Sequence, residues 1–136
     1  MQYTKEVVNH FKNPRNVGEI KDANGVGEVG NLRCGDVMHV YIKVKTRKRK
    51  AQSEKCKVME EYIEDIKFKT LGCAAAIAAS SMMTELAKGK SLDDAYKISR
   101  DDINDSLGKL PKQKYHCSIL SASAIKKAID DYRGKS

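Results

Sequence analysis

Apolar and polar residues alternate along two separate stretches of the chain. In residues 37–44 (VMHVYIKV) every second residue is apolar, namely Met38, Val40, Ile42 and Val44. A similar alternation in residues 62–70 (YIEDIKFKT) runs through Tyr62, Glu64, Ile66, Phe68 and Thr70. A period of two places successive side chains on opposite faces of a strand, so both stretches predict half-buried strands. A third, shorter strand is expected near residues 26–29.

Helical spacing of apolar residues marks the two ends of the chain and its middle. Residues 3–11 (YTKEVVNHF) place Val7, Val8 and Phe11 on one side of a short helix that ends before a proline. Residues 73–89 (CAAAIAASSMMTELAKG) predict an alanine-rich helix closed by a glycine. The last helix begins at Cys117 and carries an apolar stripe of Ile119, Leu120, Ala124, Ile125, Ala128, Ile129 and Tyr132.

The remaining segments complete the expected fold. Ser91 and Asp94 resemble a capping box at the start of another helix, residues 101–107 predict a short one, and residues 108–114 (GKLPKQK) read as a loop. The order is helix, strands, helices, which predicts an α+β fold with a small antiparallel sheet of about three strands covered by helices. A length of 136 residues allows one such domain, residues 1–136.

The positive charge is concentrated in one segment. The chain has a net charge of +8, and residues 45–57 (KTRKRKAQSEKCK) contain seven basic residues and one acidic residue. This segment lies between the two longer predicted strands, so we expect a basic hairpin arm inserted at about residues 45–61. A solvated hairpin is the favoured interpretation, a docking surface for an acidic partner is the alternative, and nucleic acid is less favoured still.

Composition also bears on the compartment. No stretch approaches the roughly 18 apolar residues that span a bilayer, and the first residues (MQYTKEVVNHF) lack the apolar core of a signal peptide. Four cysteines, Cys34, Cys56, Cys73 and Cys117, are scattered rather than densely spaced. We therefore expect a cytoplasmic protein with no membrane partner, whose cysteines are metal-binding or reactive thiols or else small buried hydrophobes.

Three of the cysteines fall where predicted elements begin or end. Cys34 precedes the strongest strand and is followed two residues later by Asp36, Cys73 joins the second strand to its helix, and the pair His116-Cys117 opens the last helix. Side chains at element ends can converge at one rim of a sheet, and helix amino termini favour thiolate over thiol. The spacing is not the CxxC pattern of a zinc ribbon or a ferredoxin.

Four phrases carry a family resemblance. They are YTKEVVNHFKNPRNVG, CGDVMHVYIKV, FKTLGCAAAIAASS and KYHCSILSASAIKKAIDDY, and they occur in the family's order. In these phrases the chain resembles the IscU-type scaffold proteins, which are similar to the amino-terminal part of NifU and assemble iron–sulfur clusters. The resemblance covers roughly residues 2–44 and 62–133, which is nearly everything outside the basic arm.

The resemblance implies a function and a ligand set. Cys34, Cys73 and Cys117 would hold a transient [2Fe–2S] cluster, with Asp36 and His116 as candidates for the fourth position. By the same resemblance, the cluster would be assembled from iron and from sulfur supplied by a cysteine desulfurase and would then be transferred to apo-proteins. Zinc would bind in place of the cluster when iron is absent. The protein would be a scaffold and not an enzyme, and an open ligand position permits a homodimer with the two cluster-bearing rims facing each other.

The chain departs from the family pattern at three places. Ala74 replaces a glycine that commonly follows the second cysteine, which should matter little. Residues 110–114 read LPKQK where the family often has LPPVK, which puts recognition by a dedicated chaperone in doubt. The basic arm has no counterpart. A sister branch of zinc-dependent sulfur acceptors has its insertion between the second and third cysteines and lacks the histidine before the third, so the arm's position and His116 favour the cluster-building branch.

Other candidate residues receive less specific interpretations. Cys56 lies in the arm without a motif and reads as an incidental thiol, and His10 and His39 lack any ligand context. Met82 and Met83 are expected in the core or at an interface. Two alternative functions remain, a sulfurtransferase that uses the same cysteines around a retained zinc ion and a zinc-stabilised protein that binds nucleic acid through the arm.

Overall fold

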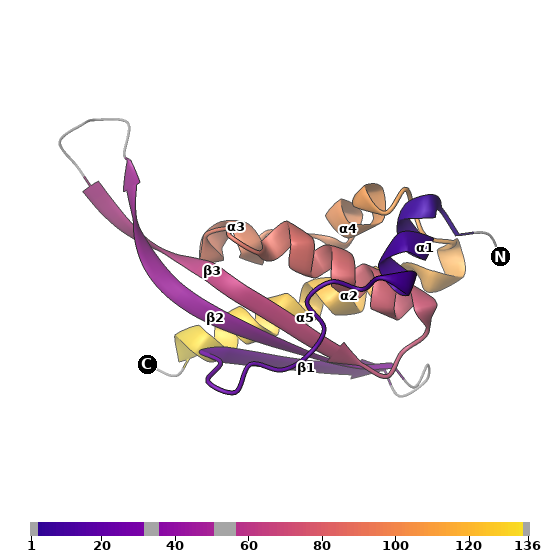
Figure 1. Ribbon diagram of the computed structural model, residues 1–136, viewed down its shortest axis with the longest axis horizontal. Helices are drawn as coiled ribbons and strands as arrows, with labels where there is room; N and C mark the ends of the chain where they lie inside the picture. The colour runs from indigo at the N-terminus through magenta and orange to yellow at the C-terminus, as the bar shows by residue number, and fades with distance from the viewer. Residues whose placement is uncertain (1–2, 32–35, 51–56, 135–136) are drawn as a thin grey trace.

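A computed structural model describes residues 3–31, 36–50 and 57–134 (Figure 1). Three antiparallel strands, β1 (Gly25–Asn31), β2 (Asp36–Lys50) and β3 (Lys57–Thr70), form a sheet in the order β1-β2-β3. The helices are α1 (Lys5–Lys12), α2 (Ala74–Ala87), α3 (Leu92–Tyr96), α4 (Arg100–Ser106) and α5 (Tyr115–Gly134), with a 3₁₀ turn at Lys112–Lys114. The predicted α+β fold, with its order of helix, strands and helices, is confirmed.

One face of the sheet forms the core. The predicted alternation is confirmed on β2, where Met38, Val40, Ile42 and Val44 are buried. On β3 it is confirmed at Ile66 and Phe68, but nearer the start of the strand Ile63 is buried in place of Tyr62 and Glu64. Helices α2 and α5 lie across this face (Figure 1). A bulge at Lys43/Val44 shifts the register between β2 and β3, and pairing is regular on either side of it.

Helix α2 is buried along most of its length. Its alanines let it approach the sheet and α5 closely, and the predicted core positions Met82 and Met83 are both buried. Buried hydroxyl groups join the layers, since Ser80 Oγ and Ser121 Oγ lie 3.2 and 3.6 Å from Met38 Sδ. Both hydroxyls also donate to carbonyls of their own helices, so their polar groups are satisfied inside the core.

Helix α1 differs from the sequence-based expectation in the face that it buries. Val7 is buried as expected, but Val8 and Phe11 are 38% and 44% exposed, and His10 is buried instead. The imidazole fits the interior because His10 Nδ1 lies 2.7 Å from Ser81 Oγ on α2. Burial is the main cause that lowers the pKa of His10, so the neutral ring suits this position.

Capping residues define the short helices. Ser91 Oγ accepts a hydrogen bond from the Asp94 backbone N–H, as expected at the start of α3. The reciprocal capping box lies one helix later, between Ser99 and Asp102. Helix α5 begins at Tyr115, two residues earlier than predicted, so Cys117 lies within its first turn rather than at its start.

Strands β2 and β3 continue as a hairpin beyond the helices (Figure 1). We call this hairpin the arm and define it as residues 45–50 of β2 and 57–61 of β3. The pairing of β1 with β2 stops at Ile42, whereas the β2–β3 register runs on to Lys50↔Lys57. None of the helices among the described residues combines the length and the apolar composition that a membrane span requires.

Candidate metal centre

The start of β2 and the end of β3 lie side by side at one end of the sheet. The Leu71 backbone N–H donates to the Val37 carbonyl over 3.2 Å, and Thr70 Oγ1 donates to the same carbonyl over 2.8 Å. Asp36 is the first residue of β2, and Cys73 follows Leu71 by two residues. The antiparallel register thus places Asp36 and Cys73 at the same end of the sheet.

Packing of α5 against β1 places the first turn of α5 at the same end of the sheet. Gly25 faces the backbone of Ala128, and Gly27 faces that of Ala124, so α5 and β1 run in opposite directions. The first turn of α5 therefore lies toward the carboxyl end of β1, where Asn31 pairs with Asp36. The His116-Cys117 pair thereby reaches the end of the sheet that holds Cys73.

Cys73 is the N-cap residue of α2. Its backbone is extended, with φ −75° and ψ −179°, and its carbonyl accepts the first helical hydrogen bond from the Ile77 N–H. The residue is half-buried and packs at the margin of the core. A thiol at a helix amino terminus faces the positive end of the helix dipole, which favours its thiolate form.

Lys114 is a site residue, although its place in the sequence predicted only a loop position without a role. Its Nζ lies 3.6 Å from Cys73 Sγ, because the 3₁₀ turn carries it over the amino terminus of α2. The negative charge of Cys73 is the main cause that raises the pKa of Lys114, and Cys117 contributes in the same direction. The phrase KYHC contains this lysine, but only the folded turn brings it to the thiol.

Cys117 and His116 form the second part of the centre. Cys117 is fully buried, and its Sγ lies 3.5 Å from Nε2 of the half-buried His116. The next residue anchors this turn, since Ser118 Oγ donates to Asn104 Oδ1 of α4 over 2.6 Å. The turn that presents Cys117 is thus held from two sides, by the sheet and by α4.

The side chains of two of the five predicted ligands are not described by the structure. Cys34 lies outside the described residues, as does Cys56 of the predicted basic arm, and for Asp36 only the backbone position is described. Within the described ranges, no group of three His, Cys, Asp or Glu side chains is placed to hold a metal ion. The described donors are two thiols and an imidazole, which suit zinc and iron.

The other two histidines lie in different surroundings. His39 is half-exposed on the polar face of β2, where its Nε2 lies 3.4 Å from Glu28 Oε2. His10 is bonded to Ser81 in the interior and lies near Glu85 on the surface. Both imidazole rings therefore interact with Ser81, Glu85 or Glu28, and none of these neighbours is a predicted ligand.

Comparison with known proteins gives a family match over nearly the whole chain. Residues 2–136 match the family described as NifU-like N terminal domain. The chain is 56% identical over 130 residues to the iron-sulfur cluster assembly scaffold protein IscU 1 of Archaeoglobus fulgidus, which covers 96% of this chain and 76% of that protein. It is 49% identical over 138 residues to IscU of Escherichia coli K12, with coverage of 99% and 97%.

Other relatives extend the comparison to larger proteins and to solved structures. The nitrogen fixation protein NifU of Azotobacter chroococcum is 41% identical over 133 residues, which make up 98% of this chain and 39% of that protein. A NifU-like protein (N-terminal) from Brucella abortus has a TM-score of 0.67 at 18% identity, with 98% and 95% of the two chains covered. This structural likeness supports the fold alone.

Proposed function

The chain belongs to the NifU-like N-terminal domain family and is an iron–sulfur cluster assembly scaffold, and we propose that the cysteine end of its sheet is where the cluster is built. The relatives are named as scaffold proteins, which agrees with the expectation that the chain is not an enzyme. The observation that carries the proposal is the convergence of Cys73 and the first turn of α5 at the end of the sheet where β2 begins.

We propose Cys34, Cys73 and Cys117 as the cluster ligands. Cys34 precedes Asp36 by two residues, which an extended chain spans in about 7 Å, so it lies within reach of the same end of the sheet. Asp36 and His116 are the two candidates for the fourth position. His116 is supported by its contact with Cys117, and Asp36 by its place at the start of β2.

A mixed ligand set suits a cargo that must be released. A [2Fe–2S] cluster held by thiolates alone is bound firmly, whereas a carboxylate oxygen is a hard donor that matches iron poorly once sulfide and thiolate already hold it. Three thiolates and one nitrogen or oxygen donor also suit tetrahedral zinc, so zinc is the expected occupant when iron is absent.

We call the end of the sheet that holds Asp36, Leu71, Cys73 and the first turn of α5 the rim. The rim is the proposed place of cluster assembly and also the proposed docking surface for partners. Leu71, two residues before Cys73, is 86% exposed and offers an apolar contact beside the thiol. We assign this rim to the cysteine desulfurase that supplies sulfur and to the apo-proteins that receive the cluster. The same rim could also face the rim of a second copy, which would give a homodimer joined across a shared cluster. We take residues 1–136 as one scaffold domain and its location as cytoplasmic, in keeping with its scattered cysteines.

Anaerobic reconstitution with analysis of iron, sulfide and zinc tests the proposal. The wild type should take up iron and sulfide and show the charge-transfer absorption of a cluster. Cys73→Ser should lose both and keep its far-UV circular dichroism, because Cys73 lies at the margin of the core, and Cys56→Ser is the matched control that should keep the cluster. A Cys73→Ser variant with a full, equally stable cluster would show that the ligand set is wrong. Zinc retained under iron-replete, reducing conditions would favour the sulfurtransferase alternative.

A further inference from the structure

Lys114 differs from the other two lysines in the segment that joins α4 to α5. Lys109 and Lys112 are exposed, whereas Lys114 is half-buried. The Nζ atom of Lys114 lies 3.6 Å from Cys73 Sγ, within the distance of an N–H···S hydrogen bond. Among these three lysines, Lys114 is therefore the one whose ammonium group is bonded to a proposed ligand.

The turn that carries Lys114 is anchored on both sides. Leu110 is buried before the 3₁₀ turn, and Cys117 is buried after it. Within the turn, the Lys114 backbone N–H donates to the Pro111 carbonyl over 2.8 Å. The side chain of Lys114 thus starts from a defined position at the rim. Its approach to Cys73 follows from the packing of the turn, which distinguishes it from the chance contact of a long surface side chain.

The electrostatic surroundings of Lys114 include both described thiols. Cys73 is the main cause that raises the pKa of Lys114, and Cys117 acts in the same direction. Cys73 is also the N-cap residue of α2, where the positive end of the helix dipole favours a negative charge. The ammonium group and the helix terminus therefore both stabilise negative charge on the sulfur of Cys73.

We propose that Lys114 is a positioning residue of the cluster centre, which keeps its hydrogen bond to Cys73 Sγ while Cys73 ligates the cluster and thereby raises the reduction potential of the cluster. The inference rests on the proposed function, because it takes Cys73 as a ligand. An ammonium group has three donor hydrogens and no lone pair, so Lys114 acts through the sulfur and does not itself bind iron.

Two physical effects of Lys114 act in the same direction. A hydrogen bond to a ligating sulfur withdraws electron density from that sulfur, which then donates less to iron, and such bonds are known to tune the potentials of iron–sulfur clusters. Reduction also adds one negative charge to the cluster, and a nearby positive charge stabilises the reduced form. Lys114 should therefore make the cluster easier to reduce.

A different role for Lys114 gives a different result. If Lys114 only balances the charge of Cys73 in the metal-free site and moves away when iron binds, the loaded cluster does not sense it. Removal of the ammonium group would then leave the potential and the absorption of the cluster unchanged. The two roles are thus separated by measurements on the loaded protein.

Measurement of the midpoint potential after anaerobic reconstitution tests the proposal. Lys114→Met keeps the unbranched aliphatic part of the side chain and removes its charge and its donors. We expect one-electron reduction of its cluster to be about tenfold less favourable, which corresponds to a potential about 59 mV more negative than in the wild type. Lys114→Arg keeps a charged donor and should stay close to the wild type. An unchanged potential in Lys114→Met would overturn the proposal.

Absorption gives a second readout that does not depend on reduction. A sulfur without the hydrogen bond donates more readily, so the sulfur-to-iron charge-transfer bands of Lys114→Met should shift to longer wavelength. If this variant folds but retains too little cluster, the sulfur-to-cobalt bands of the protein loaded with Co²⁺ should show the same shift. Bands at the wild-type positions in the iron-loaded variant, or in the cobalt-loaded variant where little cluster is retained, would also overturn the proposal.

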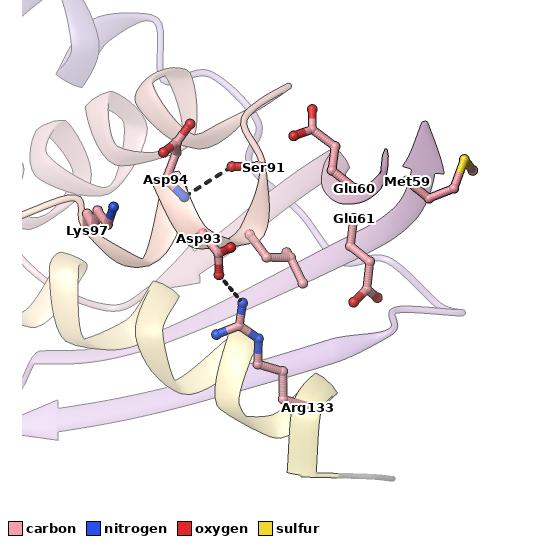
Figure 2. Close-up of a pocket in the computed structure, with 9 residues that line it drawn as sticks. Met59, Glu60, Glu61, Ser91, Asp93, Asp94, Lys97 and Arg133 are labelled. Carbon is pink, nitrogen blue, oxygen red and sulfur yellow. Dashed lines mark hydrogen bonds and ion pairs between the residues drawn. The ribbon is translucent and has the colours of Figure 1, made fainter. Parts of the chain in front are cut away.

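Two control variants remove the same charge elsewhere. Lys112→Met alters the exposed lysine of the same turn. Lys97→Met alters an exposed lysine that lines a cleft of about 710 Å³ between the arm and α3 (Figure 2). Arg133, which lines the same cleft, lies on α5 about 24 Å along the helix from Cys117. Both controls should keep the wild-type potential and bands, and a shift in Lys112→Met as large as that in Lys114→Met would refute a specific bond to Cys73.

Cys73→Ser distinguishes failure of this inference from failure of the proposed function. If the wild type takes up no cluster, or if Cys73→Ser keeps a full and equally stable one, the ligand set is wrong and the role of Lys114 falls with it. If Cys73→Ser loses the cluster while Lys114→Met matches the wild type in potential and bands, the assembly site stands and only the role of Lys114 is refuted.

Discussion

At the scale of single residues, the two described cysteines differ in burial. Cys73 is half-buried at a helix terminus, whereas Cys117 is fully buried within the first turn of α5. Replacing Cys73 by serine therefore tests ligation with little effect on folding. A serine at Cys117 also places a hydroxyl in the core, and an unpaired buried hydroxyl costs roughly 1–3 kcal/mol. Cys73 is accordingly the cleaner position at which to examine the cluster.

Asp36 allows a prediction about the release of the cluster. Its backbone lies at the start of β2, two residues after Cys34. A carboxylate is a hard donor for iron, and its charge adds to that of the thiolates and sulfides nearby. We expect Asp36→Ala to give a cluster that lasts longer in air or chelator and transfers more slowly to an apo-acceptor. Cluster decay and transfer, followed by absorption, measure both effects.

A purely structural role for Asp36 gives the opposite pattern. If Asp36 only stabilises the turn before β2, the alanine variant should melt at a lower temperature and its cluster should decay at the wild-type rate. Asp130→Ala removes an exposed carboxylate on the last turns of α5 and serves as the matched control. Decay as fast as in the wild type, or faster, would refute the role in release.

At the scale of elements, the contact between β1 and α5 determines where the last helix lies. A Cβ atom added at Gly27 would lie 2.3 Å from Ala124 O, and one added at Gly25 would lie 2.2 Å from Ala128 O. Both close approaches are to backbone, which cannot move aside as a flexible side chain can. The glycines of β1 thereby allow α5 to lie against the strand.

Gly27→Ala should separate β1 from α5. The added methyl group forces the backbone of one element to shift, and overpacking of this kind typically costs about 1–3 kcal/mol. We expect a lower midpoint in urea for Gly27→Ala. Gly134→Ala is the control, because no atom lies within 4 Å of an added Cβ there. An unchanged midpoint for Gly27→Ala would mean that the helix and strand adapt without cost.

At the scale of the whole molecule, the cysteines and the arm lie at opposite ends of the sheet. The cysteines gather where β2 begins, and the arm extends from the opposite end beyond the helices (Figure 1). Neither the rim nor the helices that carry Cys73 and Cys117 include residues of the arm. The chemistry of the cluster should therefore be independent of the arm.

Shortening the arm tests this independence. Replacement of residues 47–57 by a short glycine-containing turn should leave reconstitution of the cluster intact, because all five proposed ligand positions remain. Visible absorption, with iron and sulfide content, measures the result, and far-UV circular dichroism confirms the fold. Loss of the cluster in a folded variant would show that the arm supplies a ligand or supports the site.

The sequence predicted the features that depend on local pattern. Alternating residues in 37–44 and 62–70 indicated the paired strands, and the alanine-rich run after Gly72 indicated α2. The motif phrases indicated the family, which the comparisons confirm. These features follow from periodicity and residue type, which can be read from the sequence of neighbouring residues alone.

Only the tertiary structure decided which residues meet. Helix α1 buries His10 rather than Phe11 because Ser81 of α2 offers the ring a hydrogen bond. Lys114 approaches Cys73 because a 3₁₀ turn folds back over α2. The sequence determined the elements and the chemistry that they carry. The contacts between them depend on side chains far apart in the chain, whose packing no local pattern specifies.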